Sequence, residues 1–241
     1  MIQKERAMDI TAMADNEQEE MVVRFGWRSI IEHLVVMILF IILAITGLPQ
    51  KFFEAHWARW IISFLGGIDQ VRNIHRVVGI MFTILVVFHL AGVLYLILMK
   101  KTKPYMVPNR KDFTDAIVML RYYLGVSEES PQFDRYDYRQ KFEYWGMVFG
   151  GLIMIVTGFI LYFPVLFTDF LPGQIIPAVK VAHSAEGLLA FLVVVTWHIY
   201  NAHLNPDVFP FDFTIFTGKI SVERMLKEHL LEYMAQKEKG Q

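Results

Sequence analysis

Six of the eight histidines lie in long apolar stretches of the chain, where an ionisable side chain is costly and has a functional role by default. These six are His33, His75, His89, His183, His198 and His203. His75 and His89 are 14 residues apart. His183 and His198 are 15 residues apart. On an α-helix each pair lies within about 60° of one face and about 21 Å apart along the axis, so two helices carry matching imidazoles at two levels.

The distance between the two levels decides which cofactor these imidazoles suit. A metal ion needs its ligands within about 2 Å, so no single ion binds at both levels. Haem iron takes two axial imidazoles from opposite helices, and the porphyrin fills the gap between them. The spacing therefore favours haem. For any single histidine the alternative is a neutral imidazole that hydrogen-bonds a neighbouring helix.

Composition predicts that membrane-spanning helices position these histidines. The chain has 241 residues, of which 55% are hydrophobic and 20% charged. A bilayer core about 30 Å thick needs roughly 20 apolar residues in a helix. Four stretches qualify, namely 29–48, 75–99, 144–167 and 179–204. We predict an all-α membrane protein, a four-transmembrane-helix bundle that holds b-type haems.

Charge and cysteine content exclude several classes of function. The net charge is −1, which gives no overall attraction to nucleic acid. The chain has no cysteine, which excludes disulfides, thiolate-held iron–sulfur clusters and haem attached through a CxxCH sequence. A haem protein of this kind passes electrons on, and the substrate that supplies them must be oxidised by other subunits. We therefore expect no catalytic residue in this chain.

The distribution of Lys and Arg predicts the orientation of the chain in the membrane. Eighteen of them lie in 1–28, in 100–141 and from 205 onward, against four in 49–73 and 169–180. The positive-inside rule places both termini and the middle loop in the cytoplasm. We expect a cytoplasmic segment 1–28, a membrane domain 29–204 with the cytoplasmic loop 100–143, and a cytoplasmic tail 205–241. Residues 1–20 lack the pattern of a secretory signal, so we expect an internal helix to lead insertion.

A series of short motifs between residues 24 and 227 resembles a known family in its order. The motifs are Glu32-His33, Thr46-Gly47-Leu48, Ile74-His75, Tyr136 with Gln140-Lys141, Val156-Thr157-Gly158, His183 with Gly187, His198-Ile199-Tyr200 and Gly218-Lys219-Ile220-Ser221. The chain resembles the cytochrome b (gamma) subunit of membrane-bound formate dehydrogenases, and more broadly the b-type cytochromes of hydrogenases and thiosulfate reductases. The resemblance implies two b-type haems, the inner membrane of a bacterial cell, iron–sulfur and catalytic partner subunits, and menaquinone or ubiquinone as substrate.

The resemblance and the spacing agree on the outer haem, with His75 and His183 as iron ligands. Both residues fall near the outer surface if the second and fourth helices run in the same direction. Arg72 and Arg76 at that mouth either pair with haem propionates or anchor the helix at the headgroups.

The inner haem has two candidate arrangements. The resemblance implies His33 with His198, whereas the spacing is similar to that of cytochrome b6 and pairs His198 with His89. Depth favours His89, because His89 and His198 lie about 16 and 12 Å from the inner edge and His33 about 8 Å. His33 then pairs with His203, either at a third haem or in a quinone pocket.

Titratable groups near the inner haem are candidates for a quinone or proton site. In the resembling family the stretch that contains Asp137 and Gln140 lies against the quinone head, and Asp137 suits proton delivery. The alternative is a charged loop end that faces water. His203 is a further candidate, and Glu32 is an intramembrane acid next to a possible ligand.

We therefore expect a membrane-anchoring electron-transfer subunit that completes a larger oxidoreductase and carries a quinone-reactive site. One alternative is a transporter or ion carrier whose histidines bind protons or metal without haem. A transporter would favour spans that Gly or Pro interrupts, and no such interruption splits the second or fourth span. The other alternative is an anchor without a cofactor.

Overall fold

The computed structural model describes residues 20–206 and 208–238, so the expectations for residues 1–19 lie outside the described residues. The described chain forms two compact units, one built from 31–101 and 146–212 and the other from the described parts of 1–30, 102–145 and 213–241. The elements are β1 (Met21–Val23), α2 (Trp27–Lys51), α3 (His56–Phe64), α4 (Ile68–Met99), α5 (Arg110–Tyr123), α6 (Tyr138–Tyr162), α7 (Pro164–Thr168), α8 (Ile175–Val193), η1 (Val194–His198), η2 (Tyr200–Leu204), α9 (Thr214–Thr217), β2 (Lys219–Ser221), α10 (Val222–Glu228) and α11 (Leu230–Glu238).

Among the described residues, four helices are long and apolar enough to cross a membrane, which confirms the predicted fold class. They are α2, α4, α6 and the continuous run Ile175–Leu204, which contains α8, η1 and η2. The second span begins at Ile68 rather than residue 75, because the polar residues before His75 are already helical and Asp69 in the first turn suits the helix dipole. The third ends at Tyr162 rather than residue 167, because Pro164 starts a separate short helix.

The surface of the spanning helices has the composition of a lipid-facing surface. Only 6% of the most apolar window of α4 is buried, and side chains such as Ile84, Val87 and Phe88 are mostly exposed. A soluble protein rarely exposes apolar side chains over such an area. Such exposure is expected of side chains that face lipid rather than a protein core.

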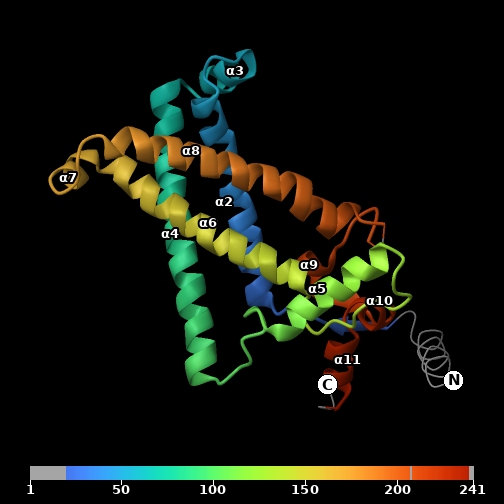
Figure 1. The fold of residues 1–241 in the computed structure, drawn as a ribbon. Helices are drawn as coiled ribbons and strands as arrows, with labels where there is room; N and C mark the ends of the chain where they lie inside the picture. Colours follow the sequence, from blue (N-terminus) through green and yellow to red (C-terminus); the bar gives the residue numbers. More distant parts are fainter. Residues whose placement is uncertain (1–19, 207, 239–241) are drawn as a thin grey trace. The chain divides into compact units, whose positions relative to one another are not determined.

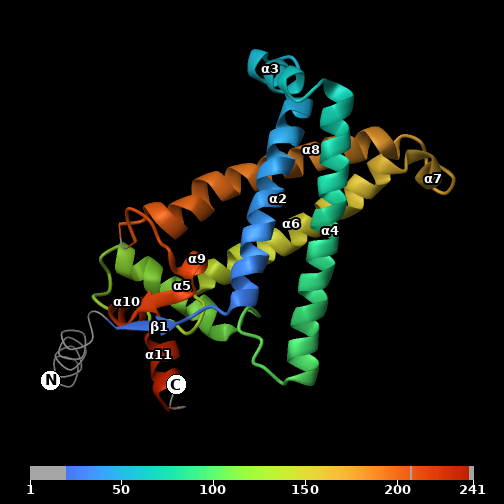
Figure 2. The same ribbon diagram turned by 180° about the vertical axis from the view of Figure 1, so that it is seen from behind.

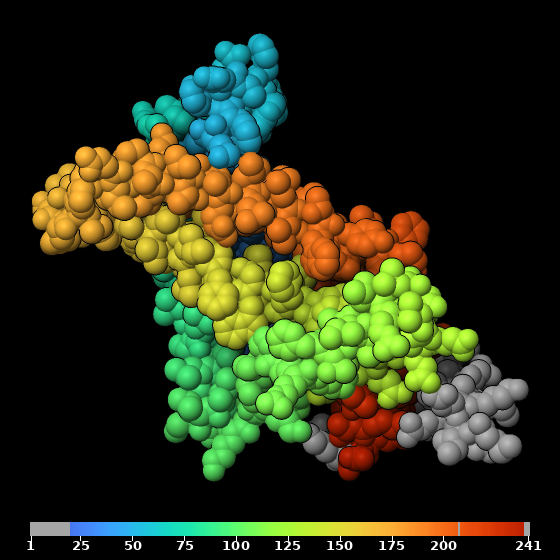
Figure 3. Space-filling model, in the orientation of Figure 1, coloured from blue at the N-terminus to red at the C-terminus, as the bar shows by residue number. Residues whose placement is uncertain are grey.

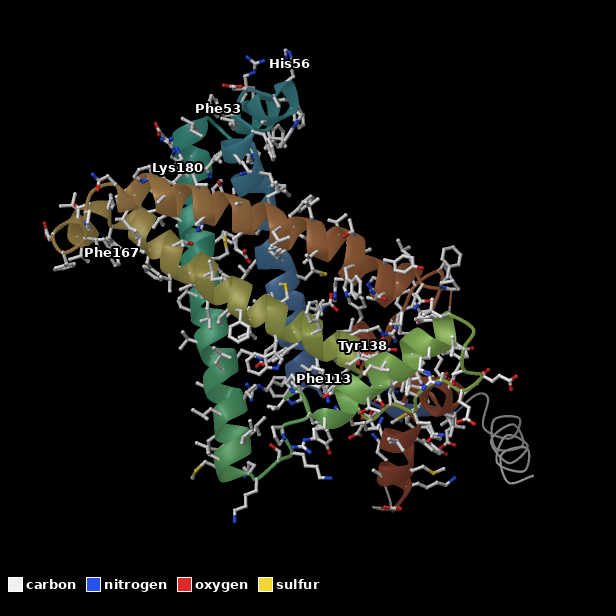
Figure 4. All side chains as sticks on the ribbon, in the orientation of Figure 1. Phe53, His56, Phe113, Tyr138, Phe167 and Lys180 are labelled. Carbon is white, nitrogen blue, oxygen red and sulfur yellow. The ribbon has the colours of Figure 1, made fainter. Side chains whose placement is uncertain are left out.

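Within the membrane unit the spanning helices form two pairs. Figures 1 and 2 show α2 beside α4, and α6 beside α8 as a second pair that crosses the first. Side chains join the pairs, since the rings of His75 on α4 and His183 on α8 are neighbours. Figure 4 marks Phe53 and His56 at the α2–α3 connection and Phe167 on α7.

The last part of the fourth span is π-helical over Val194–His198 and again over Tyr200–Leu204. A π-turn holds more residues than an α-turn and rises less, about 1.2 Å per residue against 1.5 Å. It therefore changes both the depth and the direction of the side chains that follow. π-Turns inside α-helices are frequent at functional sites.

The second unit joins segments that are far apart in the sequence. β1 and β2 form a two-stranded antiparallel sheet in which Val22 pairs with Ile220. Gly218 makes the junction possible: it has φ +74°, and a Cβ there would lie 2.6 Å from the carbonyl oxygen of Phe25. The loop and tail that the sequence describes as separate segments thus pack as one unit, with a small core of Ile220, Val222, Met225, Leu226 and Tyr233.

A buried charged cluster holds the same unit together. Arg135 donates to the carboxylate of Glu232 and to the carbonyl of Arg24, and Arg24 donates to the carbonyl of Arg135. His229 is only 4% exposed, and its Nδ1 lies 2.9 Å from the carbonyl oxygen of Asp134. Burial, assisted by the charge of Arg24, lowers the pKa of His229 from its usual 6.5 to about 4.

Acid is expected to destabilise this unit through His229. The unfolded chain binds the proton near pH 6.5 and the native chain only near pH 4, so stability is full above pH 6.5 and falls between these values. The loss at pH 4 is about 3 kcal/mol for this one group. His229→Asn keeps a donor and removes the titration, so its thermal unfolding midpoint should fall less between pH 6.5 and 4 than that of the wild type. Parallel pH profiles for the two proteins would contradict this assignment.

Candidate functional site

The outer histidines face each other across α4 and α8, as the sequence predicts. The ring centres of His75 and His183 are 6.3 Å apart, and the rings are nearly perpendicular. An axial imidazole nitrogen lies about 2 Å from its iron and the ring centre about 1 Å further on, so two imidazoles on one iron have centres roughly 6 to 6.5 Å apart. The observed separation fits one iron between them.

Each outer histidine is held by a threonine of the neighbouring helix. Thr46 Oγ1 on α2 lies 2.9 Å from Nδ1 of His75, and Thr157 Oγ1 on α6 lies 2.8 Å from Nδ1 of His183. Both hydroxyls already donate to backbone carbonyls one turn earlier, those of Ile42 and Ile153. Each therefore accepts from Nδ1–H, which leaves the lone pair on Nε2 as the metal ligand.

A glycine follows each of these threonines, and its lack of a side chain leaves room for the imidazole. A Cβ at Gly47 would lie 3.1 Å from Cε1 of His75, and one at Gly158 would lie 3.4 Å from Cε1 of His183. Both Thr-Gly pairs stand among the sequence motifs, but no role was predicted for them. The signal that could have found the role is the repeated dipeptide, once on each helix that precedes a ligand helix.

The inner pair that the structure brings together is His33 on α2 and His198 in η1. Their ring centres are 6.2 Å apart, which again fits one iron between two axial imidazoles. His33 and Thr46 are 13 residues apart on α2, so the two pairs lie about 20 Å apart along that helix. The structure thus contains two separate sites at two levels.

His89, which the depth argument favours as the partner of His198, lies instead beside Glu32. Its Nδ1 is 2.8 Å from Glu32 Oε2. The helix ends in the structure change the depths, because the fourth span ends at Leu204 and α2 begins at Trp27. His198 and His33 each lie six residues, about 9 Å, from these ends, whereas His89 lies ten residues, about 15 Å, from Met99 at the end of α4.

The charged residues at the outer end have contacts of their own. Arg72 pairs with Asp69 at 3.7 Å, and the guanidinium of Arg76 lies 5.2 Å from the ring centre of Tyr162. A propionate role for either arginine therefore stays a prediction. Lys51, which was not among the predicted site residues, donates from its ammonium to the hydroxyl of Ser184, next to His183. The sequence feature that could have pointed to it is a lysine at the outer end of an apolar span.

Asp137 and Gln140 hold each other at the start of α6. Gln140 N–H donates to Asp137 Oδ1 at 2.8 Å, and Asp137 N–H donates to Gln140 Oε1 at 3.1 Å. This reciprocal pair is a capping box. Arg139 also donates to Asp137, which is only 5% exposed. These contacts favour a structural role, and the expected quinone contact of the two residues stays a prediction.

His203 lies at the end of the fourth span, stacked on Phe211. The ring centres are 3.9 Å apart and the rings are almost parallel. The backbone N–H of Asp212 donates to Nδ1 of His203 at 3.3 Å, which places the proton of the neutral ring on Nε2. His203 is also close enough to His33 and His198 to interact with them electrostatically.

Four spanning helices with two facing imidazole pairs define a membrane cytochrome b. The family model described as prokaryotic cytochrome b561 matches residues 24–208, and the chain belongs to this family. It is similar to the formate dehydrogenase cytochrome b556(fdo) subunit of Escherichia coli strain K12, with 26% identity over 77% of this chain and 81% of that protein. It is also similar to the nitrate-inducible formate dehydrogenase cytochrome b556(Fdn) subunit of the same strain, with 22% identity over 77% and 79%.

These findings confirm the expected resemblance to a cytochrome b subunit of formate dehydrogenase type. The chain is a multi-pass bacterial membrane protein that takes part in electron transfer, and b-type haem is the cofactor of its family. The residues in the two pairs fit that cofactor in donor type and in separation.

Removing either threonine is expected to weaken the outer site without removing a ligand. Thr46→Val and Thr157→Val take away the acceptor of Nδ1–H, and losing such a partner lowers metal affinity roughly 10- to 100-fold. The less basic imidazole also favours ferrous iron, so the midpoint potential of the outer haem should rise. Redox titration by absorbance measures the potential, and pyridine haemochrome measures how much haem stays bound. The matched control is Thr83→Val, since Thr83 also donates to a carbonyl one turn earlier, that of Gly79. An equal change in the control would contradict the prediction.

Proposed function

We propose that this chain is the membrane-anchoring b-type cytochrome subunit of a respiratory oxidoreductase and passes electrons between partner redox subunits and the quinone pool. The observation that carries the proposal is the pair of facing imidazoles at each of two levels, with ring centres 6.3 and 6.2 Å apart. One level binds a cofactor, and two levels about 20 Å apart along α2 form a path across the membrane.

The proposed ligands are His75 with His183 at the outer level and His33 with His198 at the inner level. Haem iron supplies one-electron redox chemistry at each level when it is bound. The protein holds the imidazoles in the tautomer that presents Nε2, through Thr46 at His75. The surrounding spans are apolar, so a bilayer around them keeps bulk water away from both sites.

Catalytic and iron–sulfur partner subunits are proposed because this chain has no cysteine for the clusters that feed a cytochrome. The relatives' names place those proteins in formate dehydrogenases, and we propose a complex of the same general kind here. The excess of Lys and Arg in the middle loop and tail supports the inner membrane with both termini in the cytoplasm.

A quinone site at the inner end is proposed around His203. Quinone reduction takes up protons as well as electrons, so a donor near the inner pair is required. His203 carries its proton on Nε2, and its ring stacks in parallel on the ring of Phe211. The pair of His89 and Glu32 in the same unit supplies a second titratable group, at 2.8 Å from nitrogen to oxygen.

Single alanine variants test the ligand assignment. His75→Ala and His183→Ala are each expected to remove the same haem and leave the other, since either change takes one axial ligand from one iron. His33→Ala and His198→Ala are expected to remove the other haem. Haem content by pyridine haemochrome, with absorption spectra of the reduced protein, measures the loss.

His89→Ala is the matched control, because His89 also lies in a span but faces Glu32. It is expected to retain both haems. Loss of the inner haem in His89→Ala with retention in His33→Ala would reverse the inner assignment. A correctly folded wild type without haem would overturn the proposed function and favour a carrier or an anchor.

His203→Phe tests the quinone site, since it keeps a ring to stack on Phe211 and removes the proton. Reoxidation of the reduced protein by a soluble quinone analogue, followed by haem absorbance, is expected to slow about 100-fold while haem content stays the same. Wild-type kinetics in this variant would exclude His203 from proton transfer to the quinone.

A further inference from the structure

The helix α5 (Arg110–Tyr123) in the loop unit carries an apolar stripe that no described residue covers. The side chains of Phe113, Ile117, Leu120 and Leu124 are between 57% and 70% exposed. They follow the spacing i, i+4, i+7 and i+11, which places them within about 60° of one another around the helix. Figure 3 shows α5, in green, at the surface of the molecule, and Figure 4 marks Phe113 on it.

The acidic residues of α5 face inward and are neutralised there. Asp115 is only 8% exposed and accepts from Lys111 at 2.5 Å. Asp112 accepts from Lys141 at 2.7 Å. The outward face of α5 therefore presents no unpaired carboxylate from the helix itself.

The exposed charges on α5 itself are basic, and the exposed acids Glu128 and Glu129 follow only after the helix ends. Arg110 and Arg121 lie about 60° to 80° around the helix from Phe113, both on the same side of the stripe. The segment before α5 in the same unit adds the exposed side chain of Lys103. The surface of the helix is thus apolar along its centre and positive along one edge.

Contacts within the loop unit attach α5 to the start of a membrane-spanning helix. Lys141 and Trp145 both belong to α6, which spans the membrane from Tyr138. Lys141 pairs with Asp112 of α5, and the indole N–H of Trp145 donates to the carbonyl of Met106 at 2.8 Å. Tryptophan is enriched at the membrane–water interface. These contacts keep α5 near the level at which α6 enters the bilayer.

We propose that α5 is a peripheral membrane helix that lies on the anionic inner leaflet, with its apolar stripe at the boundary between headgroups and acyl chains. An amphipathic helix with a basic edge binds such a surface through apolar burial and attraction to anionic headgroups. The basic edge favours anionic lipid as the occupant over a neutral protein surface. The inference uses the proposed cytoplasmic position of the middle loop but is independent of the haem assignment.

The absence of cysteine from the sequence makes the test direct, because single cysteine variants of the full chain take one label each. Phe113→Cys, Ile117→Cys and Leu120→Cys carry a nitroxide on the stripe, and Glu128→Cys carries one on an exposed position beyond the helix. The labelled protein is placed in phosphatidylcholine vesicles with or without phosphatidylglycerol. Collisions with oxygen and with a water-soluble nickel chelate are then measured by electron paramagnetic resonance.

With phosphatidylglycerol, the ratio of oxygen to nickel collisions is expected to be roughly three- to tenfold higher on the stripe than at position 128, corresponding to a depth of about 5 to 10 Å. The ratio should fall without phosphatidylglycerol and in Arg110→Ser and Arg121→Ser backgrounds. An unchanged haem spectrum shows that each variant is folded. Stripe labels as accessible to nickel as position 128 would overturn the proposal. So would labels that become shielded from both oxygen and nickel only when partner subunits bind, because the stripe would then be a protein-docking face.

Discussion

The gap between two facing imidazoles is the constraint on which the membrane unit depends. One iron between axial histidines requires ring centres roughly 6 to 6.5 Å apart, and the two pairs show 6.3 and 6.2 Å. Lipid offers no water to satisfy a misplaced imidazole, so each ring must be held by protein. At the outer level this takes all four spans, because α4 and α8 carry the histidines while α2 and α6 carry Thr46 and Thr157.

The outer site therefore repeats one local device in two helix pairs. In each pair the first helix supplies a Thr-Gly dipeptide, whose hydroxyl fixes the tautomer and whose glycine leaves room for the ring. The second helix supplies the histidine. The inner pair has a different construction: α2 provides one histidine directly, and its partner comes from a π-helical turn. The two histidine pairs thus offer different surroundings to the proposed haems, which is one physical basis for different redox potentials.

The loop unit contains many charged side chains and lies next to a membrane-spanning helix in the sequence. Its acids are paired inward, as Asp112 with Lys141 and Glu232 with Arg135. Asp137 caps the helix that enters the bilayer. What it leaves outside is the apolar and basic face of α5, which matches the chemistry of an anionic leaflet. The charge pattern along the chain and the packing of the unit therefore favour the same orientation.

The sequence by itself determined the four spans and the outer histidine pair, because span length and the spacing of His75 and His183 from the ends of their helices are local properties. Tertiary structure decided the rest. The partner of His198 depends on where the helices end, which the apolar pattern gave only to within a few residues. His33 and His198 each lie six residues from the inner end of their span, whereas His89 lies ten residues from the end of α4. The roles of the Thr-Gly pairs and of Asp137 likewise depend on which side chains contact them. Hydrogen bonds between residues far apart in the sequence produce no periodic pattern from which they could be predicted.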